Sequence, residues 1–475
     1  MLLIPVLVLL PLLFIIPVLV LDRRHSFAVS AASAAVTLLL VVFAIALAHY
    51  YGFGPLESSF AYISSLGIGF SFGMNAFTEL LALMTGIVFL AAAISAKSFI
   101  KESEKLYNAL FLISASSTLG VFLAGNFFLL YVFWEISEVA MFFIIYIFGA
   151  YDRRYAAIKF IIFSMTSSLL LLIGIMLIYS EMPVHTFSIS EALSNAKLIP
   201  VQWQLLILAI LLVAFMIKMP IFPFHTWLPD AHTEAPAPGS MILAGVLLKF
   251  GGYGMLLAFL MLPIAAKYSF YLALLFALSI IYAGFVTLRQ EHFKRAIAYT
   301  SVVDMGVVAL GLATFNAYGY AGALYAMLSH GIVIALMFLI AGTVDESFGT
   351  LLINKLKGIA KNFSGLAYAF MFGSFAIAGL PLTCGFVGDL LVFTGATKAL
   401  GVVFLVPLLG LLLISVFMFW LAERMFFNAS EATEPYAGVD KSFAYAASLL
   451  IASTLLLGIL PEILIGPISA ALAAL

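Results

Sequence analysis

The chain has 475 residues, of which 65% are hydrophobic and only 9% are charged. A soluble globular domain carries about a quarter charged residues, so this composition excludes one and indicates a protein that crosses a membrane many times. The net charge of −1 gives no electrostatic basis for binding nucleic acid, and the single cysteine excludes an internal disulfide or a cysteine-based metal or redox cluster.

Runs of about 20 apolar residues predict membrane-spanning helices. Fourteen such runs are found near residues 2–21, 26–50, 74–97, 107–124, 126–149, 155–180, 203–228, 236–263, 268–288, 293–314, 319–343, 365–398, 401–427 and 443–470. No basic region precedes the first run and no small-residue cleavage motif follows it, so we interpret it as a retained span. The fourth and fifth runs are divided at Gly125 and Asn126, because one continuous helix would be twice as long as the bilayer is thick.

The basic residues are distributed unequally between alternate loops. Sixteen of the 21 Lys and Arg residues lie in or beside loops that follow odd-numbered spans, and three follow even-numbered spans. Since cytoplasmic loops carry the excess of Lys and Arg, the odd-numbered loops are predicted to be cytoplasmic and both termini to lie outside. The loop segment 346–361 is predicted to form a short amphipathic helix at the membrane interface.

Eight ionisable residues remain in the interior of the predicted spans once those close to the span ends are assigned to the loops. They are Glu79, Glu135, Glu138, Lys218, Lys249, Asp304, His330 and Asp389. One intramembrane charge can serve helix packing alone, but a charge there is costly unless it faces water or a partner. Eight such residues on seven helices, with both signs present, indicate an ion path whose members pair with one another.

Lys218 precedes two prolines, Pro220 and Pro223, in the seventh span. Proline interrupts a helix, and interrupted spans line the ion sites of transporters. Glu135 and Glu138 are three residues apart on one face of the fifth span, where two close carboxylates favour retention of a proton by one of them. We predict that Lys218 pairs with Glu135 in a switch that loosens when the lysine gives up its proton. The alternative for Glu138 is packing against a neighbouring subunit.

Asp389 follows Pro381 in the twelfth span, which is also rich in glycine. An interrupted span in each half of the chain is typical of an inverted repeat, and an odd number of helices in each half inverts the second half. The predicted organisation is one transmembrane domain, 1–475, with three leading helices in 1–97, five-helix repeats in 107–263 and 268–427, and a last helix in 443–470.

His330 lies between Lys249 and Asp389 in span order. A buried histidine often only fills a core, but this position suits a relay from a central lysine to an exit carboxylate. His225 and His232 lie with two acids in the loop after the seventh span. They lack the spacing of a metal site, so no metal is predicted there; we expect a hydrogen-bonded loop that caps the span.

The stretch IKMPIFPFHTWLPDAHTEAPAPGSMILAGVLLKFGGYG resembles the antiporter-like subunits of respiratory complex I, most closely the M-like subunit. The family also includes subunits of multi-subunit sodium/proton antiporters and of membrane-bound hydrogenases. The resemblance covers about residues 80 to 427 and continues in FWE at 133–135, FKRAIAYTSVVDMG at 293–306, LSHG at 328–331 and GLPLTCGFVGDLL at 379–391.

The resemblance implies an all-α fold of fourteen helices in two inverted five-helix repeats, with helices 7 and 12 broken. It also implies roles in carrying protons or sodium for the fifth-helix Glu135, the seventh-helix Lys218, the eighth-helix Lys249, the histidine His330, and Asp389 at a site where the family has lysine or glutamate. The chain departs from the family at Asp304, where complex I members often have histidine, and at Glu138, whose counterpart is often apolar. Both departures leave sodium open as the ion.

The function that the resemblance implies is ion translocation by a subunit of a redox-driven complex in the plasma (inner) membrane of a prokaryote. The chain has no haem-attachment motif and no dinucleotide fingerprint, so it is expected to bind no cofactor itself. Expected partners are other membrane subunits, including homologous antiporter-like ones, a hydrophilic redox arm and the lipid bilayer. The alternatives are a stand-alone cation/proton antiporter, a subunit of a non-redox sodium/proton antiporter, and a structural subunit that has lost transport.

Overall fold

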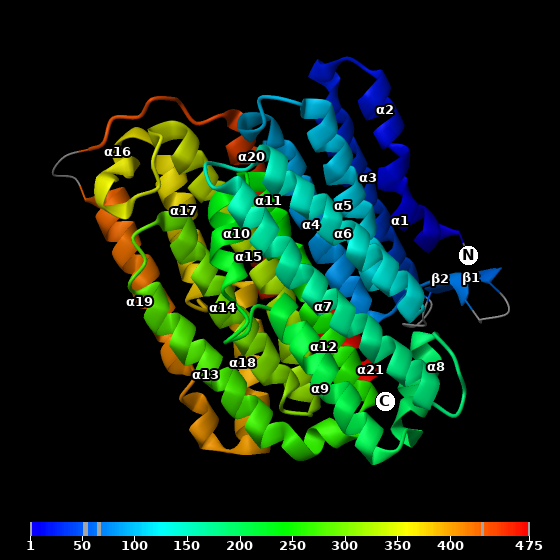
Figure 1. Ribbon diagram of the computed structural model, residues 1–475. Helices are drawn as coiled ribbons and strands as arrows, with labels where there is room; N and C mark the ends of the chain where they lie inside the picture. The colour runs from blue at the N-terminus through cyan, green and yellow to red at the C-terminus, as the bar shows by residue number, and fades with distance from the viewer. Residues whose placement is uncertain (1, 51–55, 64–67, 429–431, 474–475) are drawn as a thin grey trace.

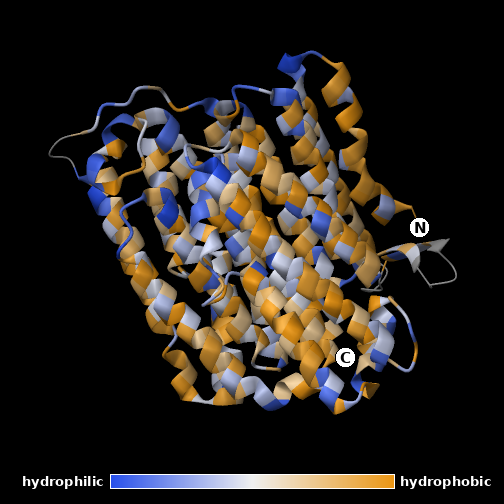
Figure 2. Cartoon of the chain, viewed as in Figure 1, coloured by the Kyte–Doolittle hydropathy of each residue, from blue (hydrophilic) through white to orange (hydrophobic). Residues whose placement is uncertain are grey.

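The computed structural model describes residues 2–50, 56–63, 68–428 and 432–473, and its regular structure is helical except for one hairpin. Thirteen helices in the described residues are long and apolar enough to cross a membrane. Most of the long helices run side by side in Figure 1, and Figure 2 shows that apolar residues dominate along them. The prediction of an all-α protein that crosses a membrane many times is confirmed.

The first part of the chain follows the predicted runs closely, with the helix pair α1 and α2 forming one apolar span. Its elements are α1 (Leu3–Leu13), α2 (Ile15–Val20), α3 (Arg23–Tyr50), β1 (Leu56–Ile63), β2 (Ile68–Met74), α4 (Ala76–Phe99), α5 (Glu104–Leu123), α6 (Phe127–Phe148) and α7 (Arg153–Glu181). The predicted division between α5 and α6 is confirmed, and Asn126 caps α6 by accepting from the Leu129 amide at 2.8 Å. The antiparallel hairpin of β1 and β2 was not predicted.

The middle of the chain contains the first interrupted span. Its elements are α8 (Ile189–Asn195), the 3₁₀ turn Ala196–Leu198, α9 (Val201–Lys218), α10 (Trp227–Glu234), α11 (Ala237–Ile242), the π-helix η3 (Leu243–Leu247), α12 (Lys249–Met261) and the 3₁₀ segment Pro263–Tyr268. Pro220 and Pro223 lie between α9 and α10, so the helix ends where proline was predicted to end it.

The last part of the chain contains the second interrupted span. Its elements are α13 (Ser269–Thr287), α14 (Phe293–Leu312), α15 (Ala317–Phe348), a 3₁₀ turn (Ile353–Lys355), α16 (Ile359–Asn362), α17 (Ser364–Ile377), α18 (Cys384–Leu400), a 3₁₀ turn (Val402–Leu405), α19 (Leu408–Leu421), a π-helix (Ala422–Phe427), α20 (Lys441–Ile459) and α21 (Glu462–Ala473). Pro381 lies between α17 and α18, where Leu382 has a φ of 74°.

Two sequence predictions differ from the observed elements. The predicted interfacial helix at 346–361 is wrong: α15 continues to Phe348, and the rest holds only a 3₁₀ turn and the four-residue α16. The predicted last span, 443–470, is divided into α20 and α21 at Leu460 and Pro461, because proline disfavours helical backbone in the residue before it.

Helix α15 is the central element of the fold, and its most apolar window is fully buried. It packs against α4, α11, α14, α17, α18 and α20. Glycine permits the closest approaches: a Cβ at Gly331 would lie 2.7 Å from the carbonyl oxygen of Gly245, and one at Gly388 would lie 2.8 Å from the amide of Ala326. Small residues of this kind let membrane helices approach backbone to backbone. The Gly331–Gly245 contact places α15 against the π-helix η3.

Replacing Gly331 with alanine is expected to destabilise the protein by about 1–3 kcal/mol, because the backbones of α15 and η3 must separate. Gly365 in α17 is the matched control, since a Cβ there would meet nothing within 4 Å. Gly365→Ala should be neutral or stabilise by up to about 1 kcal/mol through helix propensity. Thermal unfolding of both variants in the same detergent measures the difference. Equal melting temperatures would show that the contact has no energetic importance.

Candidate functional site

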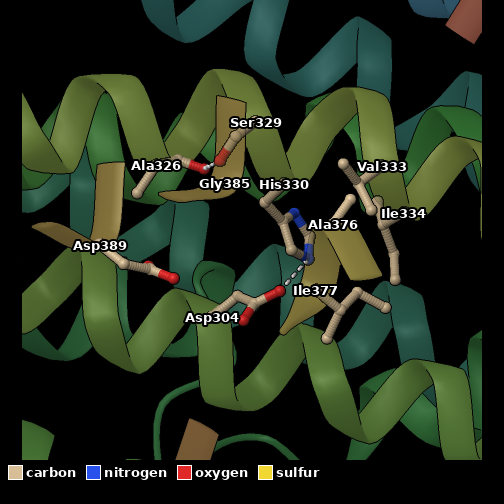
Figure 3. A pocket seen from close by; sticks show the side chains of 10 residues that line it. All are labelled: Asp304, Ala326, Ser329, His330, Val333, Ile334, Ala376, Ile377, Gly385 and Asp389. Carbon is tan, nitrogen blue, oxygen red and sulfur yellow. Dashed lines mark hydrogen bonds and ion pairs between the residues drawn. The ribbon is translucent and has the colours of Figure 1, made fainter. Parts of the chain in front are cut away.

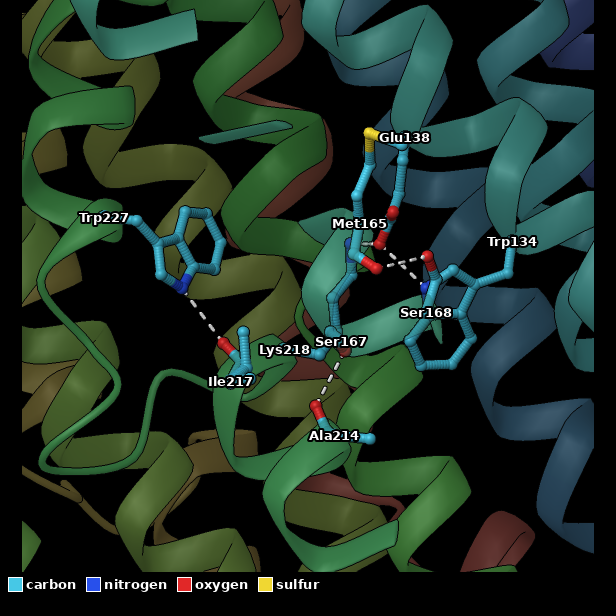
Figure 4. Close-up of polar contacts among 9 residues, drawn as sticks. All are labelled: Trp134, Glu138, Met165, Ser167, Ser168, Ala214, Ile217, Lys218 and Trp227. Atoms are coloured by element: carbon cyan, nitrogen blue, oxygen red, sulfur yellow. Dashed lines mark hydrogen bonds and ion pairs between the residues drawn. The ribbon is translucent and has the colours of Figure 1, made fainter. Parts of the chain in front are cut away.

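A buried ion pair lies where α9 ends. Lys218, the last residue of α9, is 1% exposed, and its Nζ donates to Oε1 of Glu138 at 2.7 Å. The indole nitrogen of Trp134 donates to the same oxygen at 2.7 Å (Figure 4). Both charges are out of water, so either one becomes uncompensated when its partner is removed.

The predicted contact between Lys218 and Glu135 is wrong. Trp134 and Glu138 are four residues apart and therefore share one face of α6, which is buried. Glu135 follows Trp134 and precedes Val139 by four residues, so it lies on the neighbouring face of α6. That face is half-buried at Glu135 and exposed at Val139. Glu138 is 1% exposed within this chain, so it needs no neighbouring subunit to cover it.

Aromatic rings surround the ammonium of Lys218. The ring centroids of Trp134, Phe160 and Phe250 lie 5.7, 5.8 and 5.6 Å from its Nζ. Such rings attract a cation through their faces and exclude water from it. Phe250 also follows Lys249 directly in the chain, so one aromatic residue joins the surroundings of the two predicted lysines.

The segment between α9 and α10 is fixed by hydrogen bonds that replace those of a helix. The Trp227 indole donates to the carbonyl of Ile217 at 3.0 Å, and the Phe222 amide donates to Oγ of Ser279 at 3.0 Å. The interruption leaves Lys218 in the last turn of α9, where the partial negative charge of the helix end favours a cation.

A second cluster forms around Lys249, which is fully buried at the start of α12. Its Nζ lies 2.6 Å from the carbonyl oxygen of Ala244 and 2.6 Å from Nδ1 of His330 on α15. Ala244 belongs to the π-helix η3, and π-turns of this kind often occur at functional sites. The Gly331–Gly245 contact brings these two elements together, and it explains how residues 81 positions apart come to touch.

His330 continues this cluster toward two acids. If the ammonium of Lys249 donates to Nδ1, the neutral ring carries its hydrogen on Nε2, which lies 3.8 Å from Oδ2 of Asp304. That separation is too long for a direct hydrogen bond. Asp304, Ser329, His330 and Asp389 line a cavity of about 30 Å³ (Figure 3). This volume is enough for a water molecule between the ring and the carboxylates.

The break between α17 and α18 positions Asp389. The side chain enters the small cavity from the first turns of α18 (Figure 3). Gly388, beside it, allows α18 to lie directly against the backbone of α15 at Ala326. Asp389 also lines an open, mostly apolar groove of about 740 Å³ between α18 and α19, in which Thr394 and Ser415 are further polar residues. The carboxylate therefore stands between a small interior cavity and an open groove.

Sequence reasoning assigned Lys249, His330, Asp304 and Asp389 to one path, and the fold brings all four together. Glu79 lies apart, with its carboxylate 3.6 Å from His49 near the hairpin. Trp134 and Phe250 were missed as parts of the Lys218 surroundings. The four-residue spacing from Trp134 to Glu138 was the one signal that could have identified the correct carboxylate.

The loop after α9 is hydrogen-bonded, as predicted, and the acidic residue Asp230 makes two of its contacts. Asp230 binds Nζ of Lys159 at 2.6 Å and a guanidinium nitrogen of Arg295 at 2.9 Å. The two histidines contribute less to these hydrogen bonds: Nδ1 of His225 and both ring nitrogens of His232 have no hydrogen-bond partner among the described residues. Within those residues no group of three or more His, Cys, Asp or Glu side chains is placed to hold a metal.

The chain is similar to known proteins over most of its length. The family described as "NADH:quinone oxidoreductase/Mrp antiporter, TM" matches residues 124–424. The NADH-quinone oxidoreductase subunit M of Rickettsia conorii is 36% identical over 368 residues, which are 77% of this chain and 74% of that protein. The NAD(P)H-quinone oxidoreductase chain 4 1 of a Synechococcus strain is 35% identical over 411 residues, covering 83% of this chain and 77% of that protein.

The fold is also similar to that of a solved structure. A chain of respiratory complex I from Thermus thermophilus superposes with a TM-score of 0.89 at 26% identity, covering 99% of both chains. The family match spans both interrupted helices and both lysine clusters. The chain therefore belongs to the NADH:quinone oxidoreductase/Mrp antiporter transmembrane family, and it is an antiporter-like membrane subunit of the complex I type.

Proposed function

We propose that this subunit carries protons across the membrane through its two lysine clusters. The observation that supports this most directly is the series from the buried Lys249 and His330 to the half-buried Asp304, which ends at a cavity of water size. Lys249 and His330 offer nitrogen atoms, which bind protons, whereas sodium prefers oxygen ligands. The proton is therefore the ion that this series can pass on, and sodium is the ion that the test must exclude.

The transfer follows from the hydrogen bonds. The ammonium of Lys249 gives a proton to Nδ1 of His330, and the ring releases its Nε2 proton through cavity water to Asp304. The imidazole then returns to its neutral form, so it carries no lasting charge. Asp389, which lines the small cavity and the open groove, is the exit. The pair of Lys218 and Glu138 is the switch, because loss of the lysine proton removes the attraction that holds it.

The membrane arrangement that we propose has fourteen spans. The interrupted helices α17 and α18 together form one crossing in addition to the thirteen long helices. Residues 107–263 and 268–427 form two five-helix repeats of opposite orientation, each with one interrupted span, after three leading helices in 1–97 and before a last helix in 443–470. The excess of Lys and Arg in odd-numbered loops supports termini outside a prokaryotic plasma membrane.

We also propose that the chain works inside a multi-subunit redox complex, with other antiporter-like subunits and a hydrophilic arm as partners. The relatives named for quinone oxidoreductases support this. Redox chemistry in another subunit then supplies the driving force, and this chain binds no cofactor of its own. Purification in mild detergent tests the partnership: co-purifying hydrophilic subunits support it, and a stable solitary chain would favour a stand-alone antiporter.

The transported ion is tested in proteoliposomes that contain the intact complex. Electron transfer is started with sodium absent and then present, and a pH-sensitive dye reports proton movement. We expect the same proton movement in both conditions. A strict requirement for sodium, together with uptake of radioactive sodium, would overturn the assignment of the proton.

Glu138→Gln is expected to lower proton translocation about ten-fold or more, since only Glu138 is bound to Lys218. Glu135→Gln is the matched control, because it makes the same chemical change three residues away on the half-buried face. Its effect is expected to be smaller. Dye-measured translocation at equal electron-transfer rates compares the two variants. A larger loss in Glu135→Gln would contradict the assignment of Glu138 as the partner of Lys218.

A further inference from the structure

A cavity outside the proposed ion path lies where α4 and α15 end and α20 begins. Its volume is about 500 Å³, within the range of about 300–1,000 Å³ that is typical of small-molecule sites. The three helices pack against one another, and the loops at this end all follow odd-numbered predicted spans. The cavity therefore lies at the membrane surface that carries most of the Lys and Arg residues.

The lining of this cavity changes from apolar to charged along the helices. Ile94 of α4 and Leu339 of α15 lie closest to the middle of the membrane, and Ser95 and Thr343 follow them toward the helix ends. Glu346 is seven residues beyond Leu339, or about 10 Å further along α15. Apolar groups at depth, hydroxyls next and charges at the surface match the chains, glycerol and headgroup of a phospholipid.

Two opposite charges on different helices line the cavity. Lys97 lies in the last turn of α4, and Asp440 precedes α20, where its carboxylate accepts from the Ser442 amide at 2.7 Å. The hydrogen bonds from Ser442 hold the pKa of Asp440 below its usual range, and the charge of Lys97 lowers it further. Lys97 forms no ion pair within the described residues, so room for a ligand remains between the two charges.

A second pair of charges makes the lining neutral as a whole. Nζ of Lys101 lies 3.9 Å from a carboxylate oxygen of Glu346, and both side chains are exposed. An exposed pair of this kind adds little stability, but each charge offsets the other. The best match to Lys97 and Asp440 is therefore a ligand with no net charge that carries one anionic and one cationic group.

We propose that this cavity binds a phospholipid whose headgroup combines a phosphate with a primary ammonium, as in phosphatidylethanolamine. The phosphate lies at Lys97 and the ammonium at Asp440, and the start of the acyl chains lies against Ile94 and Leu339. A soluble phosphorylated amine has the same charges but no apolar part to cover these two side chains. The binding does not depend on the transported ion or on either lysine cluster.

Headgroup chemistry separates three phospholipids as probes. The primary ammonium of phosphatidylethanolamine donates up to three hydrogen bonds to a carboxylate, as a lysine does, whereas the quaternary ammonium of phosphatidylcholine donates none. Phosphatidylglycerol has a phosphate but no cation, so its negative charge would face that of Asp440. The expected order of affinity is phosphatidylethanolamine, then phosphatidylcholine, then phosphatidylglycerol.

The test measures hydrogen–deuterium exchange of the intact complex in mild detergent, freed of lipid and then supplied with one of the three probes. Exchange is read at the backbone amides of 100–103 and 437–443, which border the cavity, so lipid bound elsewhere does not contribute. Phosphatidylethanolamine at about ten times its Kd should slow this exchange about ten-fold, because the lipid must leave before these segments open. The other two lipids should slow it less.

Lys97→Met and Asp440→Asn should each abolish the slowing by phosphatidylethanolamine. Asparagine can still accept from the Ser442 amide, so Asp440→Asn removes the charge and keeps the helix cap. Both residues are exposed, and unchanged melting temperatures in lipid-free detergent would exclude misfolding. Lys105→Met is the control, because Lys105 binds the carbonyl of Leu19 and does not line the cavity. It should leave the slowing intact.

Four results would overturn the proposal. Equal slowing by the three lipids would show that the headgroup is not recognised, and slowing that persists in Lys97→Met and Asp440→Asn would show that these charges do not bind it. Slowing by soluble phosphoethanolamine as strong as that by the lipid would exclude the lipid as the specific ligand. Slow exchange in the lipid-free complex, unchanged by any probe, would show that a neighbouring subunit covers the cavity.

Discussion

Lys249→Ala is expected to lower proton translocation by on the order of 10²-fold, because it removes the group that gives its proton to His330. The lysine is fully buried and holds two interactions, to the His330 ring and to the Ala244 carbonyl. Its loss leaves the imidazole with no donor at Nδ1. The measurement is dye-monitored proton movement by the reconstituted complex, normalised to electron transfer.

Two further variants make this result specific. Lys267→Ala removes an exposed lysine from the segment between α12 and α13, and it should leave translocation unchanged. Lys249→Arg keeps the charge but holds its proton at every accessible pH, so it should fail as the alanine variant does. Normal translocation by Lys249→Arg would show that only the charge is needed and would contradict transfer of a proton from this side chain.

Lys218→Met is expected to destabilise the protein by about 3–5 kcal/mol, which is typical of breaking a buried ion pair. The variant leaves the carboxylate of Glu138 buried at 1% exposure, with only the Trp134 indole as a donor. Thermal unfolding in detergent gives the change in stability. Translocation should also be lost, since the switch has no cation.

The double variant Lys218→Met, Glu138→Gln separates a lost contact from an unpaired charge. It should recover most of the stability, because no charge then remains buried, but it should not recover translocation. The surface pair Lys101 and Glu346, 3.9 Å apart and largely exposed, is the control. Lys101→Met should change stability very little. A double variant no more stable than Lys218→Met would contradict the pairing.

Much of the fold was predictable because a membrane imposes strong rules on sequence. Apolar runs gave most of the uninterrupted long helices to within a few residues, and Asn126 marked the turn between α5 and α6. Proline marked both interruptions, at Pro220 and Pro223 and at Pro381. The hairpin of β1 and β2 was missed, since it lies between apolar runs and a search for spans does not detect a short strand.

The choice of partner for Lys218 was not predictable from spacing alone. Glu135 and Glu138 lie within one turn of the same helix, and only the rotation of α6 in the bundle turns Glu138 inward. That rotation follows from side-chain packing, which includes Trp134 against Phe250. The resemblance favoured Glu135 because it follows the family motif, and the motif carries no information about which carboxylate the lysine reaches in this chain.

The sequence by itself determined the class of the protein, its family and the two interrupted helices. It also identified the ionisable residues in the predicted spans, because such side chains cost too much in lipid to occur there by chance. Tertiary structure decided which of these residues touch. Lys249 reaches His330 because Gly331 and Gly245 let α15 and η3 approach closely, and His232 stacks on Phe338 because α10 folds back against α15. Such contacts join residues about 80 to 106 positions apart, and packing of the whole bundle sets them rather than local sequence.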